Sequence, residues 1–239
     1  MVERRHMPNA SERGTGFPHE PANAPFSGRG LLAVLSSVIL LASLVGCEGE
    51  DAPAEIGDSQ DLFLENLSAH CGEAFLGGLS VAPEGDGMLT GTEDLLVHFR
   101  DCEPEEVRIP FHVEIEDEGT WDSSRTWYVM DVPEGLELRH DHRESDGSED
   151  DRTWYGGFSV GEGTTTQQDF SSPERTEAAD GVPVGWRIEI VPGEVYRYGT
   201  TYDGEYSWMV EFDLSEPFTG DIPDAWGHDE PPSRIPGPP

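Results

Sequence analysis

The sequence contains no lysine, and arginine alone carries its positive charge. Its 239 residues include 14 basic and 49 acidic side chains, which gives a formal net charge of −35. A chain this acidic repels phosphate backbones, so we expect no nucleic-acid partner. Without lysine the chain also lacks a P-loop lysine, a Schiff-base lysine and a Ser-x-x-Lys catalytic pair.

Signatures of metal, redox and dinucleotide sites are missing as well. The sequence has no His-Glu-x-x-His, no Cys-x-x-Cys and no Gly-x-Gly-x-x-Gly. The acidic turn at 144–151 does not follow the EF-hand spacing for calcium. The sequence therefore requires no cofactor. The sequence does not decide whether the protein is an enzyme, but it favours a protein without enzymatic activity.

The longest apolar run, residues 31–45, is short. It reads LLAVLSSVILLASLV, whereas a membrane-spanning helix needs about 20 apolar residues. A run of this length that follows arginines is typical of the apolar region of a secretory signal peptide. A membrane helix that is never cleaved is the alternative.

The run leads into Leu44-Val45-Gly46-Cys47, which resembles the lipobox of bacterial lipoproteins. In that family the signal peptide is removed and the cysteine takes a diacylglyceryl group, a role that the resemblance assigns to Cys47. It implies a cell-envelope protein that is anchored by lipid to a bacterial membrane and faces the periplasm or the exterior. Inner and outer membrane remain alternatives.

Composition divides the chain into four parts. Residues 1–46 form the predicted signal peptide, 47–60 a flexible acidic spacer, 61–216 the folded domain and 217–239 a proline-rich extended tail. The prolines of the tail are incompatible with a helix or a central strand. We expect Trp226 to fix the tail to the domain.

Within the domain, polar and apolar side chains alternate repeatedly. From Val107 to Ile115 every second residue is apolar, as in a half-buried strand. The whole pattern predicts a helix at 61–70 and strands near 72–81, 95–101, 105–116, 125–132, 135–142, 153–160, 182–190, 194–200 and 206–214. The fold class is therefore mostly β: a single antiparallel β-barrel or a sandwich, with about nine strands and one short N-terminal helix. The hairpin-length gaps favour the barrel.

Three cysteines are present. If Cys47 carries lipid, then Cys71 and Cys102 remain for the domain. Exported proteins fold in an oxidising compartment, so these two are expected to form a disulfide, with a metal pair or a reactive thiol as the alternatives.

The segment 136–142 offers the clearest candidate for a metal site. His140 and His142 share one strand face, and imidazoles two residues apart can converge on one ion. Asp141 points the other way, and the sequence marks no third ligand. The alternative is that both histidines lie at a solvated rim of the domain.

A short motif, Arg-Thr-Trp-Tyr, occurs at 125–128 and again at 152–155. In a chain with so few basic residues, Arg125 and Arg152 either pair with carboxylates or bind an anion. The aromatic residues of the strands are candidates to line a ligand cavity inside the barrel: Trp127, Trp154, Trp186, Trp208 and Phe212.

Several short sequence motifs of the domain resemble those of a group of uncharacterised secreted proteins and lipoproteins of Gram-negative bacteria. They are Leu67-x-x-His70-Cys71-Gly72, Arg108-Ile109-Pro110-Phe111-His112, Arg139-His140-Asp141-His142-Arg143, Tyr155-Gly156-Gly157 and Glu211-Phe212-Asp213-Leu214. This resemblance implies no activity. The opening of the domain is also similar to lipocalin-like barrels, a family that binds apolar ligands; this resemblance implies the fold and not the function.

The sequence thus predicts a lipid-anchored envelope protein that binds a small apolar ligand. The alternatives are a metal-dependent enzyme that uses His140 and His142, and a structural protein of the envelope. The sequence identifies neither the ligand nor the oligomeric state.

Overall fold

The computed structural model describes residues 56–83, 89–115 and 119–232. The apolar run 31–45 and Cys47 lie outside the described residues. The first described element is helix α1 (Ile56–Ser68), which begins inside the stretch predicted as a spacer. Neither helix of the described chain is long and apolar enough to cross a membrane.

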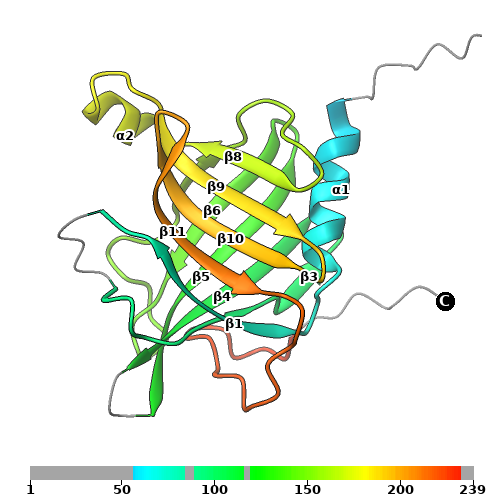
Figure 1. The fold of residues 1–239 in the computed structure, drawn as a ribbon, viewed down its shortest axis with the longest axis vertical. Helices are drawn as coiled ribbons and strands as arrows, with labels where there is room; N and C mark the ends of the chain where they lie inside the picture. Colours follow the sequence, from blue (N-terminus) through cyan, green and yellow to red (C-terminus); the bar gives the residue numbers. More distant parts are fainter. Residues whose placement is uncertain (1–55, 84–88, 116–118, 233–239) are drawn as a thin grey trace, which may run out of the picture. The chain divides into compact units, whose positions relative to one another are not determined.

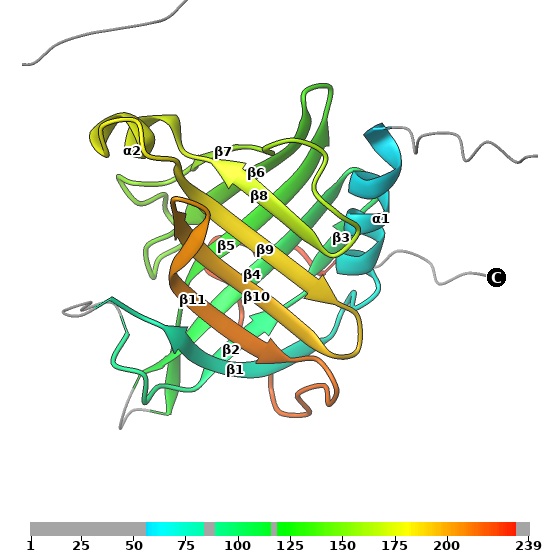
Figure 2. The same ribbon diagram turned by 45° about the horizontal axis from the view of Figure 1, so that its top comes forward.

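Ten antiparallel strands form a nearly closed barrel in the order β7-β6-β5-β4-β2-β1-β11-β10-β9-β8, and a short strand, β3, pairs with β4 beside this path (Figures 1 and 2). The strand bounds are β1 (Ala74–Val81), β2 (Leu95–His98), β3 (Asp101–Glu103), β4 (Glu106–Ile115), β5 (Thr120–Val132), β6 (Gly135–His142), β7 (Tyr155–Phe158), β8 (Gln167–Ser171), β9 (Val184–Val191), β10 (Val195–Tyr202) and β11 (Glu205–Asp213). The prediction of a barrel rather than a sandwich is confirmed.

The barrel closes weakly between its first and last strands, β7 and β8. Just past the end of β7, Ser159 forms an isolated bridge with Phe170, and the backbone N–H of Val160 donates to the carbonyl of Asp169 at 2.8 Å. These few bonds contrast with the continuous ladders between the other strands. The junction between β7 and β8, which we call the seam, is therefore the least paired part of the barrel wall.

Three elements were not predicted: β8, β3 and helix α2 (Pro173–Ala178). Strand β8 reads Gln-Gln-Asp-Phe-Ser, so the sequence shows no apolar alternation there. Gln168 is polar, but it takes an inward position and is fully buried. A buried polar residue hides the period of two on which the prediction of strands depends.

Inward-facing aromatic and aliphatic side chains fill the barrel. Trp127 stacks on Phe111 and on Tyr198, with ring centroids 5.1 Å and 4.0 Å apart. Tyr196 and Phe212 pack beside them and are fully buried. This continuous core is the main source of stability of the fold.

The predicted disulfide between Cys71 and Cys102 is present, with a Cα–Cα distance of 6.0 Å. It connects the segment after α1 to β3 and closes a loop of 31 residues. Closing a loop of this length contributes about 3–4 kcal/mol by restricting the unfolded chain. The disulfide thus holds α1 against its end of the barrel.

Candidate functional site

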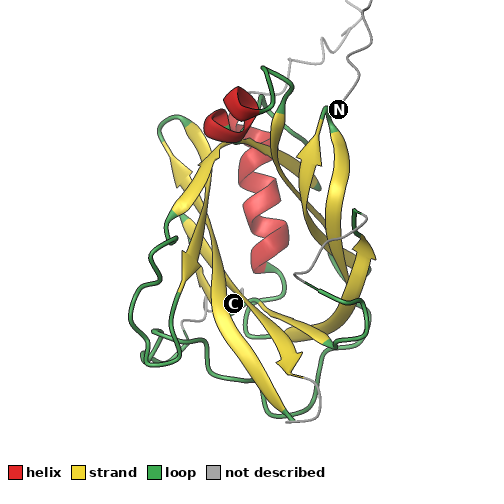
Figure 3. Cartoon of the chain, turned by 90° about the vertical axis from the view of Figure 1, so that its left-hand side faces the viewer, coloured by secondary structure: helices red, strands yellow, loops and turns green. Residues whose placement is uncertain are grey.

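The two ends of the barrel differ. At one end α1 packs Phe63, Leu64 and Leu67 into the core, and all three are buried. Figure 3 looks between the strands from the α2 side, with α1 across the far end. The end near α2, where β6 ends and β7 and β9 begin, carries polar and aromatic side chains. We call His140, His142, Tyr155, Trp186 and Tyr198 the mouth cluster.

The rings of the mouth cluster lie against one another. His140 stacks almost parallel on Tyr155, with centroids 4.5 Å apart, and lies 5.0 Å from Trp186. These contacts follow from the registers of the sheet, because His140 is directly opposite both Trp127 and Tyr155. Tyr155 is 41% exposed, so the cluster reaches from the core to the surface.

Hydrogen bonds determine which ring nitrogen of His140 carries the proton. Its Nδ1 donates to the carbonyl of Tyr155 at 3.0 Å, so Nε2 accepts from the hydroxyl of Tyr198 at 2.5 Å. Burial lowers the pKa of His140 to about 3, which keeps the ring neutral. The same cause lowers the pKa of His142, assisted by the charge of Arg125.

The predicted pair His140 and His142 is therefore brought together, but each imidazole bonds to Tyr155. Nε2 of His142 lies 3.1 Å from the hydroxyl of Tyr155. A metal ion at His140 would have to displace Tyr198 or the Tyr155 carbonyl. Within the described residues no three His, Cys, Asp or Glu side chains are arranged to hold a metal ion. The proposed metal site thus has no third ligand there.

Four of the five aromatic residues proposed to line a cavity lie inside the barrel. Trp127, Trp186, Trp208 and Phe212 are buried. The placement of Trp154 was wrong: it is 38% exposed, lies beside Tyr128 and donates from Nε1 to Glu149. Trp154 adopts a φ of 58°, which shifts the phase of the following strand. In this copy of Arg-Thr-Trp-Tyr it is the tyrosine, Tyr155, that joins the mouth cluster.

Two donors in the barrel interior have no hydrogen-bond partner in the described structure. They are the hydroxyl of Tyr196 and Nε1 of Trp208. Tyr196 is fully buried and Trp208 nearly so. Buried polar groups are almost always hydrogen bonded to protein, water or a ligand. These two donors are therefore the polar groups of the interior whose hydrogen bonding the described residues leave open.

Residues 157–161 read Gly-Phe-Ser-Val-Gly and match the Gly-x-Ser-x-Gly pattern of serine hydrolases. In those enzymes the serine occupies a sharp strand-to-helix turn. Here Ser159 lies in the barrel wall, and its Oγ accepts from the backbone N–H of Leu136 and from Gln60. The next element is a strand, β8, so the motif lacks the geometry of a nucleophile.

The C-terminal segment, 217–232, covers part of the outer wall of the barrel. The backbone N–H of Trp226 donates to the carbonyl of Ser123 at 3.1 Å, and the guanidinium of Arg100 donates to the carbonyls of His228 and Glu230. A cleft of about 440 Å³, lined by His98, Arg100 and His228 among others, lies between segment and wall.

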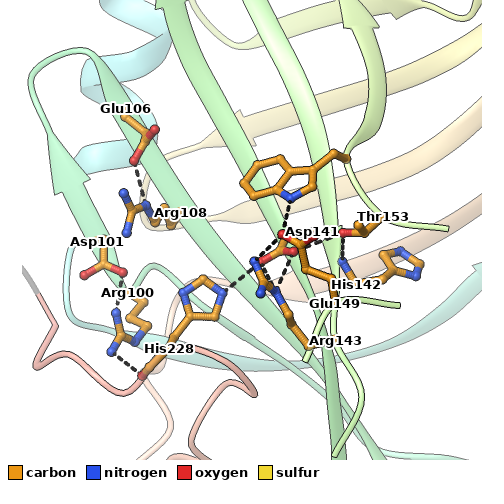
Figure 4. Close-up of polar contacts among 11 residues, drawn as sticks. Arg100, Asp101, Glu106, Arg108, Asp141, His142, Arg143, Glu149, Thr153 and His228 are labelled. Atoms are coloured by element: carbon orange, nitrogen blue, oxygen red, sulfur yellow. Dashed lines mark hydrogen bonds and ion pairs between the residues drawn. The ribbon is translucent and has the colours of Figure 1, made fainter. Parts of the chain in front are cut away.

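Asp141 anchors this segment from β6. Its side chain is fully buried and accepts hydrogen bonds from Arg143 at 2.8 Å, Thr153 at 3.1 Å and His228 at 3.2 Å (Figure 4). Burial alone would raise the pKa of Asp141, but these bonds and the charge of Arg143 lower it. Asp141 thus joins two segments that are 87 residues apart.

Comparisons of the chain with protein-family models, with curated proteins and with solved structures gave no match. The function therefore has to be argued from the barrel and its mouth.

Proposed function

We propose that this protein binds a small, largely apolar ligand inside its barrel and admits it through the end that carries the mouth cluster. The donors of Tyr196 and Trp208, which have no partner among the described residues of a mostly apolar interior, are the observation that carries the proposal. Barrel diameter grows with strand number, and eight strands already hold side chains or one small ligand. A ten-stranded barrel with one end covered by α1 is compatible with such binding.

The donors predict how binding responds to mutation. Tyr196→Phe and Trp208→Phe each remove one donor while keeping an aromatic ring. Each should weaken binding of the neutral probe 2-naphthamide about fivefold, because one neutral hydrogen bond contributes about 1 kcal/mol. Isothermal titration of the full chain in phosphatidylcholine nanodiscs, with empty nanodiscs subtracted, measures the dissociation constants.

Tyr206→Phe is the matched control. Tyr206 also has a buried hydroxyl, but its ring lies on the outer face, across Gly199 and under Arg187. This variant should bind the probe as the wild type does. A wild-type protein that does not bind 2-naphthamide saturably, or equal losses in all three variants, would contradict the proposal.

We also propose that the protein is anchored to the cell envelope by lipid on Cys47. The lipobox-like segment 44–47 supports this, and so does the Cys71–Cys102 disulfide, because disulfides persist in exported proteins. Cells that express the full chain should incorporate labelled palmitate into it, and a Cys47→Ser variant should incorporate none. Equal labelling of the two chains would disprove the anchor.

A further inference from the structure

The two ends of the seam are held in different ways. At the end near α1, side chains of the helix bind the connection between β7 and β8. Ser59 donates from Oγ to the carbonyl of Glu162 at 2.9 Å, and Asn66 donates from Nδ2 to the carbonyl of Thr165 at 2.7 Å. The helix therefore fixes this end of the seam in addition to the few backbone bonds there.

The end of the seam at the mouth has no such bonds. Just after β8 ends, the backbone N–H of Ser172 donates to the carbonyl of Val184 on β9 at 2.9 Å, away from β7. The next residue, Pro173, begins α2 and has no N–H to donate. Within the described residues no backbone hydrogen bond joins Tyr155, the first residue of β7, to β8 or α2. Side chains alone close the seam here.

These side chains are two aromatic rings and one arginine. The ring of Tyr155 lies across the seam from that of Trp186, with centroids 6.1 Å apart. The guanidinium carbon of Arg175, on α2, lies 5.6 Å from the ring centroid of Trp186. Arg175 is exposed, whereas Trp186 is only 4% exposed. The guanidinium therefore forms the outer layer over this ring.

Helix α2 has few attachments to the barrel. None of its residues is buried, and Figures 1 and 2 show it projecting from the barrel beside the end of β8. Apart from the contact of Arg175, it is attached through Thr176, whose Oγ1 donates to the carbonyl of Val184 at 3.2 Å and accepts from the N–H of Val184 at 3.0 Å. An element with so little buried surface opens at a lower cost in free energy than the paired strands of the wall.

We propose that α2 is a lid on the mouth of the barrel and that the contact of Arg175 with Trp186 is its latch. When the latch opens, α2 moves away, the rings of Tyr155 and Trp186 separate, and the ligand passes between β7 and β8. The bonds from α1 keep the other end of the seam closed, so opening is confined to the mouth. This inference rests on the proposed function, because it describes how a ligand enters the same barrel.

The test measures how fast 2-naphthamide enters and leaves the barrel. Stopped-flow tryptophan fluorescence of the full chain in phosphatidylcholine nanodiscs, with empty nanodiscs subtracted, gives the association and dissociation rate constants. Arg175→Gln should raise both constants about threefold and leave the dissociation constant unchanged, because entry and exit pass through the same open state. Thr176→Val, which removes both bonds to Val184, should act in the same direction.

Arg108→Gln is the control for the loss of an arginine from an aromatic ring. The guanidinium carbon of Arg108 lies 5.1 Å from the ring centroid of Tyr128, on the outer wall and away from the seam. Both rate constants of this variant should equal those of the wild type. The probe is neutral, so the lost positive charge does not change its attraction to the protein.

Each other result has a defined meaning. Unchanged rate constants in both lid variants would overturn the lid and leave the proposed function standing. Faster dissociation with unchanged association in Arg175→Gln would make Arg175 a contact of the ligand and would also overturn the lid. An equal acceleration in Arg108→Gln would have the same consequence. If the wild type does not bind 2-naphthamide saturably, the proposed function fails, and the lid fails with it.

Discussion

Replacing Asp141 by asparagine should destabilise the protein by about 3–5 kcal/mol, the typical loss when one partner of a buried ion pair is removed. The carboxylate is fully buried between Arg143, Thr153 and His228. Asparagine keeps the shape but loses the charge, and its amide presents hydrogens to groups that are themselves donors. The guanidinium of Arg143, which is only 19% exposed, would lose its buried partner.

Urea unfolding followed by tryptophan fluorescence measures this loss. Limited proteolysis reports the second expected effect, faster cleavage in segment 217–232, because His228 loses its acceptor. Glu211→Gln is the matched control: Glu211 forms an ion pair with Arg197 on the outer wall, where the two side chains are 42% and 33% exposed. An exposed pair of this kind contributes about 1 kcal/mol or less. Similar losses for the two variants would show that Asp141 has no special role in holding the segment.

The sequence predicted the strands whose inner face is apolar. Strand β6 was expected at 135–142 and has these bounds, because Leu136 and Leu138 mark its inner face. The prediction of strands failed at two places. At β8, Gln168 takes an inner position, and at Trp154 a positive φ reverses the phase of the next strand. Alternation reports only which face is apolar, so a buried polar residue or a backbone irregularity removes the signal.

The candidate site was predicted only in part for a related reason. His140 and His142 were expected to share a face, which the sheet confirms through their common contact with Tyr155. Tyr155 and Trp186 lie on opposite sides of the weak seam between β7 and β8, and only closure of the barrel brings their rings together. The bond between His228 and Asp141 depends on how the C-terminal segment crosses the wall. Such long-range contacts follow from topology, which no local pattern contains.

Acid should unfold this protein steeply between about pH 6 and pH 4, and buried histidines should be the main reason. Burial lowers the pKa of His98 to about 4 and those of His112 and His140 to about 3, from an ordinary value of 6.5. Below pH 6.5 the unfolded chain therefore binds protons that the folded protein does not. The free energy of unfolding is fully retained above pH 6.5 and falls as the pH drops, by about 1.4 kcal/mol per pH unit for each histidine.

A His98→Leu/His112→Leu double variant distinguishes the effect of the buried histidines from the effect of the carboxylates. Both histidines lie in the wall near the C-terminal segment, and Nε2 of His112 has no hydrogen-bond partner in the described structure. The variant should lose a large part of the slope, because only His140 and His142 then contribute to it. Urea unfolding at half-unit steps from pH 8 to pH 4 measures the slope, and any difference at pH 8, where all three rings are neutral, is subtracted as packing. An unchanged slope would mean that carboxylates such as Asp141, whose lowered pKa acts in the same direction at lower pH, dominate the acid response.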